Sequence, residues 1–258
     1  MMGSIAGDII GSVYESRPIK TADFEPLFGL RCGPTDDTFL TVATASALLS
    51  DRDYASAYRN YGRKYPKAGY GASFQRWVLE ESAPAYKSWG NGSAMRVSPI
   101  GWACSSRDQV LDEAAKSAIV THDHPEGIKG AQATALAVFL ARTGSSKDEI
   151  KEDIEMTFGY DLTRRLDDIR PEYRFDVSCQ GSVPESIIAF LESRSTEDAI
   201  RLAISLGGDS DTQACIAGGI AEAYYGPLGA ELSEEVSRRL PDDEIQILNA
   251  FVNRFMEA

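Results

Sequence analysis

Hydrophobic and polar positions alternate with helical spacing along most of the chain. Apolar residues recur at i, i+3, i+4 and i+7 in four segments, which predicts amphipathic helices over residues 38–50, 107–120, 128–142 and 196–206. Weaker forms of the same pattern predict helices over 54–65, 71–81, 146–158, 182–193, 211–225 and 243–257. No pair of alternating strand patterns joined by a turn is found. The pattern therefore predicts an all-α fold.

Capping residues support two of these helix starts. Ser195 precedes Glu197 and Asp198, and Ser146 precedes Glu149. A serine hydroxyl accepts a hydrogen bond from a free amide of the first turn, and an acidic side chain there is favoured by the helix dipole. These signals place the starts of the helices near residues 146 and 196.

Glycine recurs every fourth residue at the beginning of the chain, at Gly3, Gly7 and Gly11. Such a stripe lets a second helix backbone come close, at a propensity cost of about 1 kcal/mol per glycine. We therefore expect a tight helix crossing here. The irregular stretch 159–181 is expected to be a connecting loop with a short helix, because helical pattern resumes on both sides. A chain of this length is predicted to form one domain over residues 1–258.

Composition narrows the range of functions. The chain has 26 Lys and Arg against 39 Asp and Glu, a net charge of −13, which repels nucleic acid and anionic lipid. We therefore expect neither a nucleic-acid nor a membrane partner. Only two histidines occur, His122 and His124, so a multi-histidine zinc or iron site is excluded. Any bound metal is expected to have oxygen ligands.

The cysteines, the first residues and the apolar runs indicate where in the cell the protein is expected. No CxxC motif occurs among the four scattered cysteines, Cys32, Cys104, Cys179 and Cys215. That usage is typical of a reducing cytoplasm. The first residues lack the basic region of a secretory signal, and no apolar run is long enough to span a membrane. We expect a cytoplasmic protein. The sequence carries no signal for the oligomeric state, and a monomer is the default expectation.

Two acidic clusters lie at predicted helix starts, at residues 33–38 (GPTDDT) and 207–212 (GGDSDT). Capping explains one or two carboxylates per helix, but not paired aspartates combined with threonine and glycine in both clusters. If the two helix starts converge, their four carboxylates repel one another unless a cation lies between them. The clusters therefore indicate a site for Mg²⁺, Mn²⁺ or Ca²⁺. An EF-hand is excluded, since Ile220 stands where its bidentate acid is needed.

Five segments of the chain, taken in order, resemble the ADP-ribosylglycohydrolase family. They are residues 3–15 (GSIAGDIIGSVYE), 33–49 (GPTDDTFLTVATASALL), 90–101 (GNGSAMRVSPIG), 121–138 (THDHPEGIKGAQATALAV) and 206–226 (LGGDSDTQACIAGGIAEAYYG). The resemblance implies a compact, orthogonal multi-helix bundle. It also implies an enzyme that removes ADP-ribose from modified proteins or small molecules with the help of two Mg²⁺ or Mn²⁺ ions.

The resemblance assigns metal ligands residue by residue. It implies that six residues hold the two ions: Thr35, Asp36, Asp37, Asp209, Asp211 and Thr212. Glu15 falls where one branch of the family has a mobile glutamate that reaches the metal or the catalytic water; the alternative is an exposed acid at a helix end. Asp8 could either bind a metal ion directly or hydrogen-bond to the residues that do, and the sequence leaves both roles open.

The resemblance also implies which residues bind the substrate. The loop Gly90, Asn91, Gly92 and Ser93 corresponds to the segment that wraps ADP-ribose, where glycines let backbone amides approach a phosphate. His122 matches a histidine near the phosphates of the ligand, although a histidine opening a helix is equally typical of a structural cap. Arg96 completes the family pattern and is either a further site residue or a structural ion-pair partner, whereas His124, before Pro125 at a helix start, is expected to be structural.

The implied reaction is hydrolysis of the bond at the anomeric carbon of the ribose. The metal pair would bind ribose hydroxyls and a water, and a carboxylate among Glu15, Asp36 and Asp209 would be the base or proton relay. Residues 12–15 (SVYE) resemble the serine and poly(ADP-ribose) branch more than the arginine branch. Two alternatives remain: an inactive ADP-ribose-binding or structural member of the family, and a hydrolase of another ribose or sugar phosphate. The intact set of six metal positions argues against an inactive member.

Overall fold

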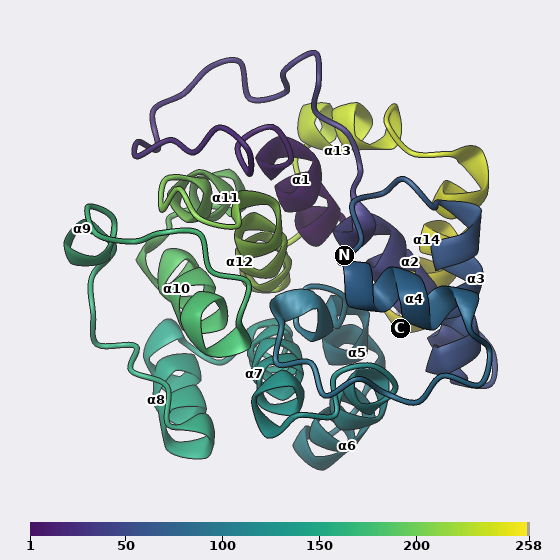
Figure 1. Cartoon of the computed structure of the whole chain (residues 1–258). Coiled ribbons are helices and arrows are strands. Elements are labelled where there is room, and N and C mark those ends of the chain that lie inside the picture. The colour runs from purple at the N-terminus through teal and green to yellow at the C-terminus, as the bar shows by residue number, and fades with distance from the viewer. Residues whose placement is uncertain (257–258) are drawn as a thin grey trace.

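The computed structural model describes residues 1–256, and its regular structure is helical (Figure 1). No β-strand forms in this part of the chain; one isolated bridge joins Gly90 to Ser178. The all-α prediction is confirmed. None of the helices within residues 1–256 combines the length and the hydropathy needed to cross a bilayer.

Helix α12 lies in the centre of the molecule, with four helices packed around it. The five are α1 (Met2–Gly11), α7 (Pro125–Arg142), α10 (Cys179–Glu192), α11 (Thr196–Ile204) and α12 (Ser210–Tyr225). Nearly every residue of α12 is buried, and its sequence is small or apolar on all sides. A helix without a polar face is stable only when other helices cover it, which explains its central position.

A second group of helices packs around α2 (Asp36–Leu49). It comprises α3 (Tyr54–Lys64), α5 (Ser98–Ala103) and α14 (Asp242–Phe255). The remaining elements are α4 (Ala72–Leu79), the 3₁₀ turn η1 (Asn91–Ser93), α6 (Arg107–Ile119), α8 (Lys147–Phe158), α9 (Leu166–Ile169) and α13 (Ala230–Ser237). Helix α6 packs on α7, and α7 contacts both α12 of the first group and α5 of the second.

The predicted helices are present, with bounds shifted by a few residues. Helix α7 begins three residues earlier than predicted, because Pro125 occupies its first turn and the ring of His124 accepts the N–H of Glu126. Ser146 and Glu149 form the capping box that the sequence indicated. Helices α5 and α13 were not predicted, being too short to show a full period. Residue 257 of the range 243–257 lies outside the described residues.

The glycine stripe of α1 packs directly on the backbone of α12. A Cβ at Gly7 would lie 2.0 Å from the carbonyl oxygen of Ala214, and one at Gly3 would lie 2.3 Å from that of Gly218. The backbone N–H of Gly3 also donates to a carboxylate oxygen of Glu222, at 2.8 Å. The predicted tight helix crossing is confirmed, and it places the chemistry-bearing ends of α1 and α12 side by side.

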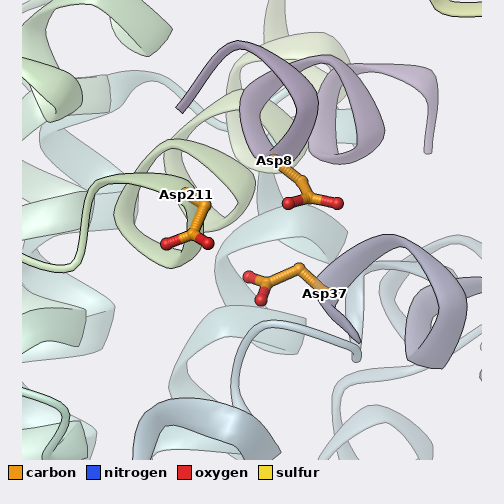
Figure 2. Close-up of side chains that lie close together, drawn as sticks. All are labelled: Asp8, Asp37 and Asp211. Atoms are coloured by element: carbon orange, nitrogen blue, oxygen red, sulfur yellow. The ribbon is translucent and has the colours of Figure 1, made fainter. Parts of the chain in front are cut away.

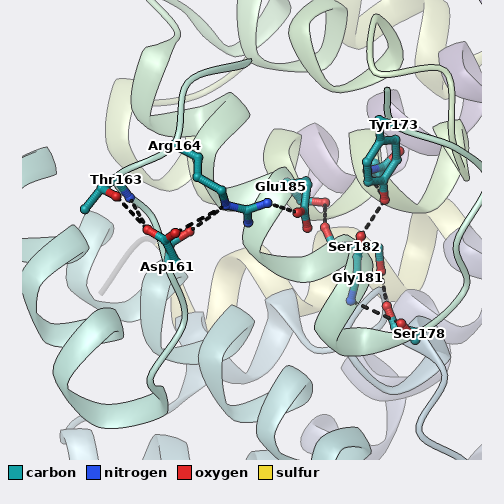
Figure 3. A network of polar contacts seen from close by, with 10 residues as sticks. Asp161, Thr163, Arg164, Tyr173, Ser178, Gly181, Ser182 and Glu185 are labelled. Atoms are coloured by element: carbon teal, nitrogen blue, oxygen red, sulfur yellow. Dashed lines mark hydrogen bonds and ion pairs between the residues drawn. The ribbon is translucent and has the colours of Figure 1, made fainter. Parts of the chain in front are cut away.

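The stretch 159–178 runs along the surface as a loop that contains the short helix α9. Polar contacts fasten it to α10 (Figure 3): a guanidinium nitrogen of Arg164 lies 2.8 Å from a carboxylate oxygen of Glu185, and the hydroxyl of Tyr173 donates to the carbonyl of Gly181 at 2.6 Å. The end of the loop is then tied to η1, since the N–H of Asn91 donates to the carbonyl of Val177 at 2.7 Å.

Candidate metal centre and cleft

The first acidic cluster begins α2, and Asp8 of α1 fixes its geometry. One carboxylate oxygen of Asp8 accepts the hydroxyl of Thr35 at 2.6 Å, and the other accepts the N–H groups of Thr35 and Thr38 at 2.9 and 3.0 Å. The hydroxyl of Thr38 donates to the same carboxylate. Thr35 caps the N–H of Asp37 from within the segment, while the N–H of Thr38 is capped by a residue of another helix. Asp8 therefore joins α1 to the start of α2.

The acidic residues at the ends of α1, α2 and α12 converge. Carboxylate oxygens of Asp8, Asp37 and Asp211 all lie within 4.8 Å of one another and face a common centre (Figure 2). Oxygens of Glu15, Asp209 and Asp211 form a second such group. Asp211 belongs to both groups, so the two groups are adjacent. The convergence predicted for the two helix starts is confirmed.

Hydrogen bonds orient some of these carboxylates and leave one unpartnered. An oxygen of Asp209 accepts the side-chain amide of Asn91 at 2.7 Å, and Oδ2 of Asp37 accepts the hydroxyl of Thr212 at 3.3 Å. Oδ1 of Asp37 is buried and has no hydrogen-bond partner within residues 1–256. A buried oxygen in this state is costly unless an ion or water binds it. The hard oxygen donors and this unpartnered atom fit a divalent cation.

Burial and mutual repulsion disturb the ionisation of the cluster. Burial raises the pKa of Asp36 to about 8, with the charge of Asp8 adding to the rise. Burial, followed by the charge of the neighbouring aspartate, raises the pKa of Asp37 and that of Asp211 well above the usual range. The pKa of Glu15 is also raised, first by burial and then by Asp209. Each shift has the sign expected for carboxylates that lack a counter-ion.

All but one of the predicted site residues line one cleft of about 440 Å³. The acidic wall carries seven of them: Glu15, Thr35, Asp36, Asp37, Asp209, Asp211 and Thr212. Asp36 belongs to neither three-carboxylate group found in residues 1–256; one of its oxygens lies on the side of Gly69, 3.2 Å from where a Cβ of that glycine would be. Asp8, whose role the sequence left open, is the residue that groups with Asp37 and Asp211.

A second wall, joined to the first by the hydrogen bond from Asn91 to Asp209, carries the predicted substrate residues. Gly90, Asn91, Gly92 and His122 line the cleft, whereas Ser93 is fully buried behind them and donates to the carbonyl of Gly127 at 2.7 Å. A Cβ at Gly92 would lie 3.3 Å from Nε2 of His122. The glycine therefore leaves room for the imidazole edge at the cleft. Burial, together with the charge of Arg96, holds the pKa of His122 well below its usual value.

A buried arginine, Arg96, also belongs to this wall. Arg96 is fully buried, and its guanidinium carbon lies 4.0 Å from the centroid of the Tyr58 ring. It donates to two neutral oxygens, the carbonyl of Ser117 at 3.0 Å and the hydroxyl of Thr121 at 2.9 Å. Nε and Nη1 have no hydrogen-bond partner within residues 1–256. The structural alternative for Arg96 was an ion pair, and the observed contacts are a cation–π stack and neutral acceptors instead.

The sequence reasoning missed part of the cleft. Its lining includes residues 69–74, with Gly69, Gly71, Ala72 and Ser73, at the start of α4. Tyr86, Ser88 and Val177 also line it. Gly69 and Gly71, at the start of the helix predicted over 71–81, were a usable signal, because glycine at a helix start is the arrangement that admits an anion. Val177 carried no comparable signal, since only the fastened loop brings it to the cleft.

Comparison with known proteins assigns the chain to a family. The sequence profile described as ADP-ribosylglycohydrolase matches residues 1–257. The chain belongs to the ADP-ribosylglycohydrolase family. The resemblance noted in the sequence is thereby confirmed, and the family supports a glycohydrolase enzyme acting on ADP-ribosyl compounds.

Several characterised ADP-ribosylglycohydrolases are similar over most of their length. ADP-ribosylhydrolase ARH3 of Bos taurus is 30% identical, with 88% of this chain and 84% of that protein aligned. ADP-ribosylarginine hydrolase Tri1 of Pseudomonas putida is 24% identical, with 89% and 70% aligned. Among solved structures, one described as an ADP-ribosylglycohydrolase-related protein complex superposes with a TM-score of 0.73 at 24% identity, covering 98% of this chain and 96% of that one. This likeness supports the ADP-ribosylglycohydrolase fold.

Proposed function

We propose that the protein is a divalent-cation-dependent hydrolase that cleaves the glycosidic bond between ADP-ribose and a modified side chain or small acceptor. The observation that carries this proposal is the pair of adjacent three-carboxylate groups sharing Asp211 at one wall of the cleft. In two-metal sites the ions lie about 3.5–4 Å apart, which suits two adjacent groups with a shared carboxylate.

The ligands that we propose are Thr35, Asp36, Asp37, Asp209, Asp211 and Thr212, all of which line the cleft. Bound Mg²⁺ or Mn²⁺ would supply Lewis-acid stabilisation and a water of lowered pKa. Hydrogen bonds within the chain position these ligands. Asn91 holds one oxygen of Asp209 and leaves the other for the cleft, while Asp8 holds the first turn of α2 in place.

Proton transfer is assigned to Glu15. Its carboxylate belongs to the second group of acids, and no hydrogen bond within residues 1–256 holds it. Asp209 is less suited, because the amide of Asn91 already donates to it. A base must reach the proton it accepts, and Glu15 is an exposed residue after the end of α1 that also lines the cleft.

The substrate would lie between the two walls. ADP-ribose carries two phosphates, and the second wall offers the imidazole of His122 and the glycine turn of residues 90–92. For the acceptor, we propose an oxygen linkage such as that of ADP-ribosylserine, supported by the resemblance of residues 12–15. The similarity to an ADP-ribosylarginine hydrolase makes the arginine linkage the comparison substrate.

The test is release of ADP-ribose from serine-linked and arginine-linked peptides and from poly(ADP-ribose), with Mg²⁺ or Mn²⁺ and with a chelator. We expect release from the serine-linked peptide only with metal, and at least a 100-fold loss in Asp209→Asn, because the variant keeps the shape but loses a charged ligand. Asp112→Asn, at an exposed acid whose ion pair is with Lys116, is the matched control and should keep full activity.

Two outcomes would overturn the proposal. Equal release with and without chelator would remove the metal from the reaction. Full metal-dependent activity in Asp209→Asn would remove this carboxylate from the site. Release from the arginine-linked peptide alone would keep the hydrolase and refute the oxygen linkage.

A further inference from the structure

A chain of three side chains runs from the buried arginine to the cleft. Nη2 of Arg96 donates to the hydroxyl oxygen of Thr121 at 2.9 Å, and that oxygen lies 2.8 Å from Nδ1 of His122. Thr121 is fully buried just beyond the end of α6, where the N–H groups of Thr121 and His122 both donate to the carbonyl of Ala118. The backbone therefore fixes the positions of both side chains.

The direction of these hydrogen bonds follows from the donors available. A guanidinium carries only donors, so Arg96 occupies a lone pair of the Thr121 oxygen. The hydroxyl has a single hydrogen, and its 2.8 Å contact with Nδ1 of His122 is a hydrogen bond in which either atom can be the donor. The hydroxyl of Tyr86 also interacts with the Thr121 side chain. If Nδ1 carried a hydrogen, the Thr121 oxygen would accept from both Arg96 and His122, and its own hydrogen would have to turn to Tyr86. The short contact therefore favours Nδ1 as the acceptor, and a neutral imidazole then carries its hydrogen on Nε2.

Nε2 is the nitrogen that faces the cleft. It lies 3.3 Å from where a Cβ of Gly92 would be and 3.6 Å from where a Cβ of Gly90 would be, and both glycines line the cleft with His122. No side chain or backbone group within residues 1–256 forms a hydrogen bond with Nε2. Any side chain at position 92 would crowd this nitrogen. The glycine turn keeps it available to a ligand.

We infer that Arg96 and Thr121 are positioning residues that lock His122 in its neutral Nε2–H form, so that it donates a hydrogen bond to an acceptor oxygen of the bound ligand. His122 is then a binding donor and takes no part as an acid or base. Arg96 adds to this effect, because a second proton on the ring would place two positive charges side by side. The acceptor is an anionic oxygen of phosphate type; this identification of the ligand rests on the proposed function, whereas the state of the ring does not.

The ring state can be read by NMR, because the chain has only two histidines. Long-range ¹H–¹⁵N spectra of the ¹⁵N-labelled full chain near neutral pH, assigned with His124→Asn, should show Nδ1 of His122 unprotonated and Nε2 protonated. Protonated Nδ1, two protonated nitrogens or averaged signals in the wild-type protein would overturn the inference. This measurement needs no ligand and no variant of the three residues.

Variants at Thr121 test the cause. Thr121→Ser keeps the hydroxyl and should keep the spectrum, whereas Thr121→Val has nearly the same shape without a donor and should shift the ring toward the Nδ1–H form. An unchanged spectrum in Thr121→Val would refute the role of Thr121. If Thr121→Val does not fold, Arg96→Lys provides the second variant, since the shorter reach of lysine to Thr121 should also weaken the preference.

Binding of ADP-ribose with Mg²⁺ tests the ligand. The dissociation constant should rise about tenfold or more in Thr121→Val, the effect of losing a hydrogen bond to a charged group, and stay within about twofold of wild type in Thr121→Ser. Equal affinity in all three proteins would refute the donor role. Absence of ADP-ribose binding in the wild type would refute the proposed function and leave the ring-state result standing.

Discussion

The two walls of the cleft bury charge of opposite sign and accommodate it differently. On one wall the carboxylates of Asp37 and Asp211 face each other, and Oδ1 of Asp37 has no partner in residues 1–256. On the other, the guanidinium of Arg96 stacks on Tyr58 and donates to neutral oxygens. A guanidinium is delocalised and weakly hydrated, so an aromatic face can replace much of its water; a carboxylate has a localised charge and needs donors or a cation.

The comparison teaches that equal burial does not bring equal compensation. Burial and then the neighbouring charges raise the pKa of the carboxylates, whereas the guanidinium has an aromatic face and two neutral acceptors, with only Nε and Nη1 left without a partner in residues 1–256. Stability of the metal-free protein should therefore respond to changes in the acids in one way and to changes around His122 in another.

The largest effect is expected from metal binding itself. Mn²⁺ at about one hundred times its dissociation constant should stabilise the wild-type protein by about 2.7 kcal/mol, because the ion binds the folded state alone. In Asp37→Asn the metal-free protein should melt a few degrees higher than wild type, since a desolvated charge is removed, and added Mn²⁺ should no longer raise the melting temperature. Thermal melts with and without chelator measure both. A lower melting temperature for metal-free Asp37→Asn would contradict the picture of an uncompensated acidic wall.

A smaller effect is expected at Asp8, behind the acidic wall. Its carboxylate accepts N–H and O–H donors from Thr35 and Thr38, and an amide in its place would turn a donor toward them. Asp8→Asn should therefore weaken Mn²⁺ binding by about 10- to 100-fold, as for residues that orient metal ligands. Isothermal titration calorimetry measures the affinity, with Asp112→Asn as the control. Unchanged affinity would mean that the start of α2 is held without Asp8.

The smallest effect concerns the basic wall and depends on pH. Burial, then Arg96, keeps the pKa of His122 well below 6.5 in the folded protein, so below that pH the unfolded chain binds a proton that the folded chain does not. His122 therefore contributes fully to the free energy of unfolding above pH 6.5. Its contribution decreases as the pH falls and is about 1.4 kcal/mol smaller one pH unit below 6.5. His122→Asn lacks this term, so its free-energy cost should shrink by that amount between about pH 7.5 and 5.5. Urea unfolding at several pH values measures it, and a cost independent of pH would show that the ring takes up its proton normally in the fold.

The acidic wall could be predicted from sequence because most of its carboxylates are local to two helix starts. Paired aspartates beside threonine and glycine mark both starts, and the glycine stripe of α1 predicts that a second helix crosses it closely. What brings the two starts together, however, is a long-range contact. The role of Asp8 stayed open in the sequence for this reason, since its partners Thr35 and Thr38 lie about thirty residues away.

The other wall could be predicted only in part. The turn at residues 90–93 and His122 carry family signals, but the start of α4 and Val177 reach the cleft through tertiary packing. The same limit applies to Arg96, whose sequence context suggests an ion pair. Its stack on Tyr58 and its bond to Thr121 join segments whose relation is set by the packing of α3 and α6. Local sequence patterns show where the functional side chains are, while contacts between helices determine how these side chains are oriented and protonated.

The glycine contact between α1 and α12 has a consequence for how the site can vary. Gly7 directly precedes Asp8, and a Cβ at Gly11 would lie 2.6 Å from Cα of Asp211, so the backbone separation at these glycines sets the distance between the two acids. Residues with no reactive group thus set the spacing of the proposed ion site. A methyl group added at Gly11 would press on the backbone of Asp211, so we expect it to change which ionic radius the site accepts while every carboxylate side chain stays the same.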